Sequence, residues 1–532
     1  MHDPCSVPRS SASLDVNVLT DIIPATMCRT NDTSFAQAMM FLPALILGPS
    51  LLLDQVAATS LKVAIIGAGA GGSSASYWLS LAKQRAAAGT NVDITVYEQD
   101  NRVGGRSTTV YPYNDTTYAP IELGASIFTK GNHNLVRAAS EFGFDLVEFS
   151  GAVPGTGVWN GNKFVWRTTD NSTADGLRMQ ERYQDGPSKS GALVVPFLTS
   201  FASSYTPTFP QFPTVAAYAY AVNYTSLGTV TLKSYLSQGG VNLNWINDFM
   251  TGSSRFNYAQ DVSTINGVAG MTSLSAGTAY SAKPGNFKIF EQFLSRSGAS
   301  LQLETTVKSV KKATGSKPKY RVETTKGAAD FDAVIVAAPL PLTNIKFTNT
   351  ASQPSSFPKV NYLHLHVTLL TTTTPSLLPA YFKVDNSSAL PGTVLTTAEY
   401  GSKPEFNSIR YQTSIERNGK TEYVVKMFSP GKISDETLAT LFGKGTIGWV
   451  FRKEWDAYPY YPPRSDYPPV KLDTGLYYVN SMEGLFSTME TETISSRNVV
   501  DLLSTELLGS GLCGPEGAKG PVTDTYAVGW DC

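Results

Sequence analysis

The sequence of 532 residues has little charge, little histidine and little cysteine. Charged residues make up only 16%, and 42 Lys+Arg against 43 Asp+Glu give a formal net charge of -1. Because binding to nucleic-acid phosphates needs a surplus of positive charge, this balance excludes nucleic acid as the main partner. Hydrophobic residues make up 42% of the chain, enough for a large buried core, which excludes disorder as the dominant state.

The few cysteines and histidines leave little room for metal chemistry. The cysteines are Cys5, Cys28, Cys513 and Cys532. They form no C-x-x-C pair, and their spacing excludes a zinc ribbon or an iron–sulfur cluster. His364 and His366 lie in a β-like run, residues 362–370, and would share one strand face. Without a nearby third ligand they are expected to be ordinary strand residues, so we predict no metal.

An apolar run near the N-terminus predicts entry into the secretory pathway. Residues 39–53 (MMFLPALILGPSLLL) have the length of a signal-peptide core, and small residues at 56–58 offer a cleavage point. The run is interrupted by proline and glycine and is shorter than the roughly 20 residues of a stable membrane span. We expect residues 1–58 to be a leader, with the signal-like segment at 39–58. A membrane anchor or a buried helix is the alternative.

The rest of the chain carries features that agree with secretion. Acceptor triplets for N-glycosylation begin at Asn114, Asn171, Asn223 and Asn386. Removal of the leader would leave Cys513 and Cys532 as the only cysteines, an even number suited to one disulfide in the tail, residues 513–532. Two free buried thiols are the alternative. We predict a vacuolar, lysosomal or extracellular location.

The first segment after the leader has the pattern of a dinucleotide site. Residues 61–66 (LKVAII) predict a buried strand, residues 73–88 a helix, and residues 92–97 a second strand. The G-x-G-x-x-G motif lies between the first strand and the helix, and an acid ends the second strand. The predicted cofactor residues here are Gly67, Gly69, Gly72 and Glu98. They would provide the tight turn, the approach to a pyrophosphate, the helix–strand packing and the acceptor for a ribose hydroxyl.

The continuation of this unit indicates which dinucleotide is bound. Arg102, Gly105 and Arg106 follow the ribose acid, and two arginines around a glycine pair can clamp the phosphates of an extended cofactor. This extension resembles the second motif of the amine-oxidase-like FAD flavoproteins. Gly124 and Ala125 are similar to the segment that passes close to the flavin ring in that group.

Later segments are expected to return to the same domain. Residues 301–310, 320–325, 331–337 and 475–480 read as strands, and residues 490–508 as a helix. Val307 best matches the flavoprotein position that contacts adenine. Met489 and Glu490 open the helix, whose dipole can stabilise negative charge on a reduced flavin. Taken alone, these segments also suit an ordinary α/β core.

More specific segments resemble the prenylcysteine oxidase (prenylcysteine lyase) family. They include residues 255–266 (RFNYAQDVSTIN), 455–463 (WDAYPYYPP) and 476–483 (LYYVNSME), and the similarity extends over about residues 61–508. The resemblance implies non-covalent FAD and oxidation of S-farnesyl- or S-geranylgeranyl-cysteine by O2. The implied products are a prenyl aldehyde, cysteine and H2O2.

Candidate catalytic residues come from the polar groups of these family-like segments, although the sequence assigns none of them a role. They are Glu122, Tyr258, Gln260 and Glu483. An isoprenoid tail needs an apolar slot, for which residues 194–205, 209–224 and 362–370 are candidates, plain core packing being the alternative. The expected partners are a lipophilic small molecule and O2, with peripheral membrane contact. We infer no protein partner.

We therefore predict an α/β fold with two domains. A discontinuous Rossmann-like FAD-binding domain would comprise residues 59–150, 265–345 and 455–512. A mixed α+β substrate domain would comprise residues 151–264 and 346–454. The predicted function is thioether oxidation of prenylcysteine. A flavin oxidase of the amine-oxidase type acting on another lipophilic amine, thioether or alcohol is one alternative, and a flavin- or lipid-binding protein without turnover is another.

Overall fold

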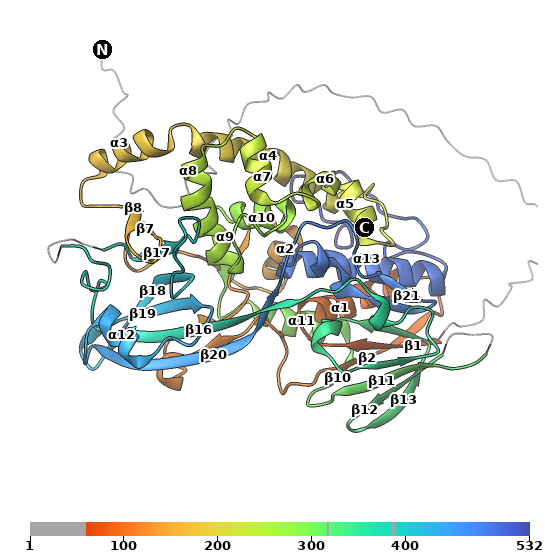
Figure 1. Cartoon of the computed structure of the whole chain (residues 1–532). Coiled ribbons are helices and arrows are strands. Elements are labelled where there is room, and N and C mark those ends of the chain that lie inside the picture. The colour runs from red at the N-terminus through yellow and green to blue at the C-terminus, as the bar shows by residue number, and fades with distance from the viewer. Residues whose placement is uncertain (1–59, 316–318, 386–389) are drawn as a thin grey trace, which may run out of the picture.

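The computed structural model describes residues 60–315, 319–385 and 390–532 (Figure 1). The predicted leader with its signal-like segment at 39–58, and the acceptor Asn386, lie outside the described residues. Among the helices of the described part, none is both long and apolar enough to cross a membrane.

The first layer is a six-stranded, mainly parallel sheet with the order β10-β2-β1-β14-β22-β21. Its strands are β1 (Ser60–Ile66), β2 (Asn91–Tyr97), β10 (Ser300–Gln302), β14 (Ala333–Val336), β21 (Lys471–Asp473) and β22 (Leu476–Tyr478). Residues 63–66 of β1 and all of β14 are buried, because both faces of the sheet are covered. The strands predicted at 61–66 and 92–97 are confirmed.

Helices cover one face of this sheet and a second sheet covers the other. The helices are α1 (Ala70–Arg85), α2 (His133–Glu141), α11 (Phe287–Ser297) and α13 (Met489–Leu508). The second sheet has the order β13-β12-β11-β15, with β11 (Val307–Lys312), β12 (Tyr320–Thr324), β13 (Gly327–Phe331) and β15 (Lys346–Thr348). In Figure 1 the label α1 lies above β1 and β2, and β11 to β13 lie below them.

The strand predicted at 301–310 is wrong as a single element. The chain leaves β10 and turns before β11, and the two strands belong to different sheets. Backbone hydrogen bonds fix this turn, from Glu304 N to Asp100 O at 2.9 Å and from Thr305 N to Glu98 O at 2.8 Å. The turn is therefore decided by the loop that follows β2, far away in the sequence.

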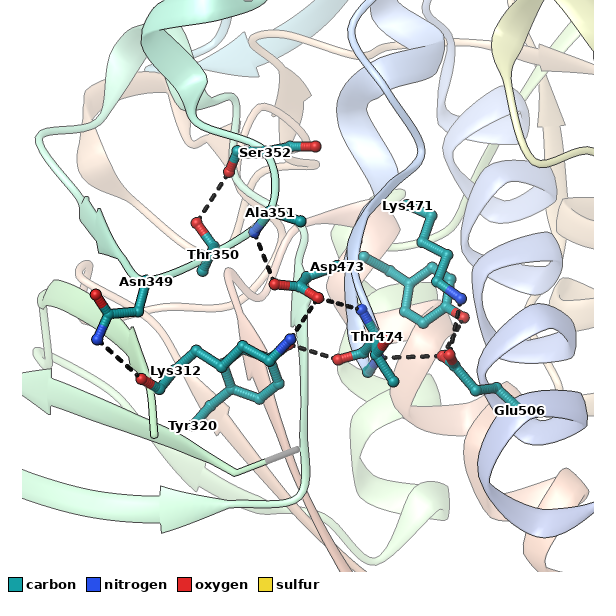
Figure 2. Close-up of polar contacts among 12 residues, drawn as sticks. Lys312, Tyr320, Asn349, Thr350, Ala351, Ser352, Lys471, Asp473, Thr474 and Glu506 are labelled. Atoms are coloured by element: carbon teal, nitrogen blue, oxygen red, sulfur yellow. Dashed lines mark hydrogen bonds and ion pairs between the residues drawn. The ribbon is translucent and has the colours of Figure 1, made fainter. Parts of the chain in front are cut away.

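A polar junction joins the second sheet, β21 and α13 (Figure 2). Asp473 accepts hydrogen bonds from Lys312 Nζ at 2.6 Å and Ala351 N at 2.7 Å. Glu506 on α13 accepts one from the Tyr477 hydroxyl at 2.7 Å. Burial raises the pKa of Asp473, but its donors outweigh that effect and hold the pKa below the usual value. The junction therefore favours the ionised carboxylate.

A separate seven-stranded sheet, with the order β20-β16-β19-β18-β17-β7-β8, lies beside these layers in Figure 1. Its strands are β7 (Thr156–Trp159), β8 (Phe164–Arg167), β16 (Tyr362–Thr372), β17 (Thr393–Thr396), β18 (Ser408–Arg417), β19 (Lys420–Ser429) and β20 (Ile447–Pro459). The pairing is antiparallel except between β7 and β17. Two small sheets link this part to the first layer: β3 (Thr109–Val110) with β4 (Ile121–Glu122), and β5 (Phe128–Thr129) with β9 (Ala279–Ala282) and β6 (Leu146–Glu148).

A group of helices runs along the top of Figure 1, above the seven-stranded sheet and, at α5 and α6, above α13. They are α3 (Ser172–Tyr183), α4 (Gly186–Ala202), α5 (Val215–Ala221), α6 (Thr225–Gly228), α7 (Leu232–Gln238), α8 (Leu243–Trp245), α9 (Thr251–Tyr258) and α10 (Gly267–Leu274). A further helix, α12 (Asp435–Phe442), packs on the sheet itself. The α/β prediction is confirmed, whereas the residue boundaries of the two domains stay a prediction.

Candidate active site

A cavity of about 970 Å³ opens at the carboxyl ends of the central parallel strands. Gly67 follows β1, Glu98 follows β2 and Ala337 follows β14, and all three line it. In the sheet, β2 lies on one side of β1 and β14 lies on the other side. The end of β1 is therefore the point where the strand order reverses. Open α/β sheets bind their ligands at this point.

Most of the predicted cofactor residues line this cavity. Those that do are Gly67, Gly69, Glu98, Arg102, Gly105, Arg106, Gly124, Ala125, Val307 and Met489. Gly72 lies behind the wall, where a Cβ would stand 1.8 Å from Gly67 O, so its role is the close packing of helix on strand. Glu490 does not line the cavity, contrary to the expectation.

The glycine motif brings two backbone segments close together at the wall of this cavity. Gly67 has φ +104° and its amide donates to Tyr97 O at 2.8 Å, which turns the chain tightly into α1. A Cβ on Gly69 would meet nothing closer than Gly105 Cα at 3.8 Å, and one on Gly105 would stand 3.2 Å from Gly69 Cα. The N-terminal amides of α1 therefore lie beside a narrow space that suits a pyrophosphate.

Glu98 holds the loops around this space. Its Oε2 accepts a hydrogen bond from Ala68 N at 2.7 Å and its Oε1 accepts one from Asp100 N at 2.9 Å. Burial raises the pKa of Glu98, although these amides act against the rise. Each carboxylate oxygen can accept a second hydrogen bond, so the predicted contact with a ribose hydroxyl stays compatible with this position.

Both predicted phosphate-binding arginines line the cavity and are also hydrogen-bonded to the protein, so their contact with phosphates stays a prediction. Arg102 Nη2 donates to Gly105 O at 2.7 Å, and this bond braces the glycine pair. Arg106, whose side chain is 28% exposed, forms an ion pair with the buried Glu483. Burial by itself would lower the pKa of Arg106, but Glu483 outweighs it and the net shift is upward. Arg106 therefore puts a fixed positive charge in the cavity wall.

Another part of the wall comes from Gly124, β20 and the start of α13. A Cβ on Gly124 would stand 2.0 Å from Arg106 O and 2.5 Å from the Trp455 ring, so only glycine fits here. Thr488 caps α13: its Oγ1 accepts from Thr491 N at 3.0 Å, and its amide donates to Thr491 Oγ1 at 2.7 Å. Thr488 and Met489 line the cavity, so the positive end of this helix dipole faces it.

Four buried polar atoms of the lining residues lack a partner within the described chain: Ser107 Oγ, Trp455 Nε1, Asn480 Oδ1 and Glu492 Oε1. The side chains of Asn480 and Glu492 also join each other, with Asn480 Nδ2 donating to Glu492 Oε2 at 3.0 Å. Burial raises the pKa of Glu492 well above its usual value, and the nearby Glu483 adds to the rise. Unpaired buried polar groups are costly, so these atoms point to a ligand that pairs with them.

Sequence reasoning chose Glu490 instead of Glu492 as the acid of this helix. Glu490 faces the start of α2, where it accepts hydrogen bonds from Asn134 N at 2.9 Å and Leu135 N at 3.0 Å. The hydroxyl of Tyr205 donates to it at 2.7 Å. Both acids lie in the first turn of α13, about 200° apart around the axis, so they point to different sides of the helix. The sequence does not show which of these sides faces the cofactor cavity.

Glu122 belongs to a buried pair beside the cavity wall. Its Oε1 accepts from Asn286 N at 2.6 Å, and burial raises its pKa to about 8. Lys426 on β19 donates to Glu122 O and to Ser126 Oγ, both at 2.8 Å. Burial lowers the pKa of Lys426 to about 8, against the attraction of Glu122. Sequence reasoning missed Lys426, since a lysine in a strand gives no sign of burial.

The other three candidate catalytic residues brace loops around the cavity. The hydroxyl of Tyr258 donates to Ser487 O at 3.0 Å. Gln260 Nε2 donates to Pro459 O at 3.0 Å, and Gln260 Oε1 accepts from Tyr461 N at 3.0 Å. Glu483 pairs with Arg106. Neither these three nor Glu122 is among the lining residues of either cavity described here, and their catalytic roles stay predictions.

A second cavity of about 650 Å³ lies among α3, α4, α9 and the seven-stranded sheet. Its wall is mainly aromatic and aliphatic, including Trp166, Met179, Trp245, Phe249, Phe256 and Leu395. Glu148 and Arg410 supply charge at the same wall. Ala125 lines the first cavity and Ile127 lines the second, so one short segment takes part in both walls. Of the three runs expected to form an apolar slot, only Val195 contributes.

The family model for prenylcysteine lyase matches residues 166–510, and a model for an NAD(P)-binding Rossmann-like domain matches residues 65–142. The first match spans more than half of the chain. The chain belongs to the prenylcysteine lyase family.

Curated relatives of this family member match most of the chain. Farnesylcysteine lyase from Arabidopsis thaliana is 28% identical over 467 residues, which cover 83% of this chain and 87% of that protein. Prenylcysteine oxidase 1 from Homo sapiens is 27% identical over 463 residues, which cover 82% of this chain and 87% of that protein.

Solved structures place this prenylcysteine lyase family member in the fold of the flavin amine oxidases. Cyclohexylamine oxidase from Brevibacterium oxydans matches with a TM-score of 0.54 at 14% identity, covering 84% of this chain and 99% of that chain. Putrescine oxidase bound to putrescine gives a TM-score of 0.55 at 14% identity over the same shares of the two chains. The protein is therefore a flavin oxidoreductase of the prenylcysteine oxidase family with a Rossmann-like cofactor domain.

Proposed function

We propose that this protein is an FAD-dependent thioether oxidase that cleaves S-prenylcysteine. The overall reaction would convert the thioether, O2 and water into a prenyl aldehyde, free cysteine and H2O2, which balances atoms and electrons. The observation that carries the proposal is the second, mainly apolar cavity, whose wall shares the segment of Ala125 and Ile127 with the cofactor-sized cavity. Family membership supports the same substrate class.

The residues of the first cavity fit non-covalent FAD. The narrow space beside Gly69 and Gly105 suits the pyrophosphate, and Glu98 suits the adenosine ribose. The unpaired buried oxygens of Asn480 and Glu492 are the independent sign of a polar ligand. With its pKa raised, the Glu492 carboxyl can carry a proton and donate it in a hydrogen bond.

Hydride acceptance from the allylic carbon beside sulfur, and delivery of the electrons to O2, is the chemistry that bound flavin supplies. The hydrogen leaves carbon with its electron pair, so the protein needs no strong base there. The chain's own task is to orient the substrate and to control water. Trp455 and Tyr458 close one wall of the first cavity with aromatic surface. Water must still reach the activated carbon, because the aldehyde oxygen comes from it.

The second cavity has an apolar wall that suits the prenyl tail of a prenylcysteine and two charged residues that suit its amino acid part. Burial of each methylene contributes roughly 0.8 kcal/mol, so ten such groups of a tail would contribute on the order of 8 kcal/mol before the cost of association. The guanidinium of Arg410 and the carboxylate of Glu148 are suited to the carboxylate and the ammonium of the cysteine part. We propose that the tail lies on the aromatic wall and the amino acid at these charges.

Anaerobic mixing of the purified holoprotein with farnesylcysteine tests the function. We expect the flavin absorbance to bleach, and we expect H2O2 and the aldehyde to form when O2 is admitted. Bleaching by long-chain amines instead of farnesylcysteine would favour an amine oxidase. A flavin that no such substrate reduces would indicate a binding protein without turnover, and a colourless protein that FAD cannot reconstitute would exclude both oxidases.

A variant tests the location of the substrate. Ala192 lies exposed on α4 and lines the second cavity, so Ala192→Trp should narrow the cavity without disturbing the core. We expect KM for farnesylcysteine to rise at least about tenfold, equal to about 1.4 kcal/mol, at unchanged FAD content. Ala216→Trp, on the exposed side of α5 and outside the cavity, is the matched control. Equal KM values for both variants would place the substrate elsewhere.

We also propose a vacuolar, lysosomal or extracellular location, with lipophilic substrate drawn from membranes by peripheral contact. The tail disulfide between Cys513 and Cys532 supports an oxidising route. The acceptors Asn114, Asn171 and Asn223 are all exposed. Endoglycosidase treatment of the protein from its own cells should increase its mobility on a gel. Unchanged mobility, together with a cytosolic fraction of the protein, would contradict the location.

A further inference from the structure

His364, His366, Glu454 and Asp456 form a compact cluster of metal-type ligands on the seven-stranded sheet, and of these four only Asp456 also lines the first cavity. His364 and His366 are two residues apart on β16, so they point to the same face. On the neighbouring antiparallel strand β20, Asp456 pairs in register with His364, and Glu454 pairs with His366. Directly opposed residues have their Cβ atoms about 4.5–5.5 Å apart. The strand pairing therefore supplies the carboxylates that the spacing of the two histidines alone did not reveal.

The side-chain atoms of the cluster are already close to one another. His364 Nδ1 lies 3.1 Å from Asp456 Oδ1, and His364 Nε2 lies 3.9 Å from Glu454 Oε2. His366 Nδ1 lies 3.7 Å from the same Glu454 oxygen. One ligand atom from each of His364, His366 and Glu454 fits within 4.8 Å of the other two. A tetrahedral ion with bonds of about 2.0–2.1 Å needs its ligand atoms about 3.4 Å apart, so small side-chain rotations suffice.

The charges around the cluster leave room for a cation. Within the described part of the chain, the ion pairs of Glu454 and Asp456 are made with the two histidines and with no lysine or arginine. A divalent ion would balance the negative charge of the two carboxylates. The side chains of His364, Glu454 and Asp456 are 55%, 68% and 44% exposed, so an ion can enter from solvent.

We propose that His364, His366 and Glu454 bind one divalent transition-metal ion of the Zn²⁺ type, while Asp456 orients the ring of His364 through its Nδ1 atom. Two imidazole nitrogens with carboxylate oxygens suit Zn²⁺ and Co²⁺, whereas Mg²⁺ and Ca²⁺ prefer sites made of oxygen alone. The ion would tie β16 to β20. On the opposite face of this strand pair, Trp455 lines the cofactor cavity. The site would therefore brace that wall from behind and take no part in the oxidation.

Cobalt titration of the full-length holoprotein tests the site directly. The protein is purified with a tag free of histidine, stripped with a chelator and titrated with Co²⁺, following the visible absorption of tetrahedral cobalt. We expect a band that saturates at about one Co²⁺ per chain and disappears when one equivalent of Zn²⁺ is added. Absence of saturation up to a hundredfold excess of Co²⁺ would overturn the proposal.

Variants locate the binding. In the double variant His364→Ala and His366→Ala the band should be lost, and Glu454→Gln should weaken binding at least tenfold. Asp330→Asn removes an exposed carboxylate from β13, in another sheet, and should leave the titration unchanged. Circular dichroism and flavin content verify that each variant is folded. Retention of the band in the double variant, or equal weakening by Asp330→Asn, would show that the metal binds elsewhere and would overturn the site.

Discussion

Gly69→Val should weaken the binding of FAD while leaving the stability of the fold nearly unchanged. Gly69 has φ -78° and ψ -166°, an extended conformation that any residue adopts. A Cβ there would lie 3.8 Å from Gly105 Cα, at ordinary contact distance. Loss of unfolded-chain freedom favours Gly69→Val by about 0.4–1 kcal/mol, and the poorer helix cap costs about 1 kcal/mol. The free energy of unfolding of the chain without cofactor should therefore change by less than about 1 kcal/mol.

Cofactor binding should respond very differently. The valine methyl groups would project into the cavity beside Gly105 and keep a pyrophosphate away from the amides of α1. Each hydrogen bond to a charged group contributes about 1.5–3 kcal/mol, so loss of two costs about 3–6 kcal/mol. We expect the Kd for FAD to rise more than about a hundredfold, measured by flavin fluorescence quenching on the apoprotein.

Two other glycines serve as controls for this experiment. Gly131→Val adds the same side chain at an exposed position outside the cavity and should leave the Kd for FAD unchanged. Gly72→Ala puts a Cβ 1.8 Å from Gly67 O and should destabilise the fold itself. A folded Gly69→Val protein with full FAD occupancy would refute the proposed pyrophosphate site.

Three further predictions concern buried acids and the tail. Glu492→Ala should raise the Kd for FAD about 5- to 150-fold, the effect of about 1–3 kcal/mol, whereas Glu492→Gln, which still donates, should stay within about threefold; equal Kd values for the two variants would contradict a donor role. Burial raises the pKa of Glu490 to about 7 from 4.5, so its stabilising effect is complete below 4.5 and is lost as the pH rises to 7. The free energy of unfolding should accordingly fall by about 3 kcal/mol between about pH 5 and pH 7.5, and the Tm should fall with it. Glu490→Gln should flatten this pH dependence, and an unchanged slope in the variant would contradict the assignment. Replacement of both Cys513 and Cys532 by serine, which opens a loop of sequence separation 19, should lower the free energy of unfolding by about 3 kcal/mol without loss of FAD; an unchanged denaturant midpoint would contradict this.

The first βαβ unit was predictable because its signals are local. One continuous segment contains the run of buried apolar residues, the glycines of the turn and the acid at the end of β2. Each of these features determines the backbone conformation or the contacts of residues close to it in the sequence. The disulfide followed from counting cysteines, and the structure pairs Cys513 with Cys532. Even here the boundaries moved: the helix predicted at 73–88 is α1 at Ala70–Arg85.

The rest was decided by contacts between distant segments, which no local pattern encodes. The sequence predicts Arg106 at the cofactor site, where it does line the cavity, but only folding brings Glu483 against it. The two acids at the start of α13 look alike in sequence, and only the packing of that helix turns Glu492 to the cofactor cavity and Glu490 to α2. The wall of the second cavity is assembled from short helices and sheet strands far apart in the chain. By itself the sequence determined the local backbone and the chemistry of each residue, whereas strand register and helix rotation, which depend on the whole core, decided which residues meet.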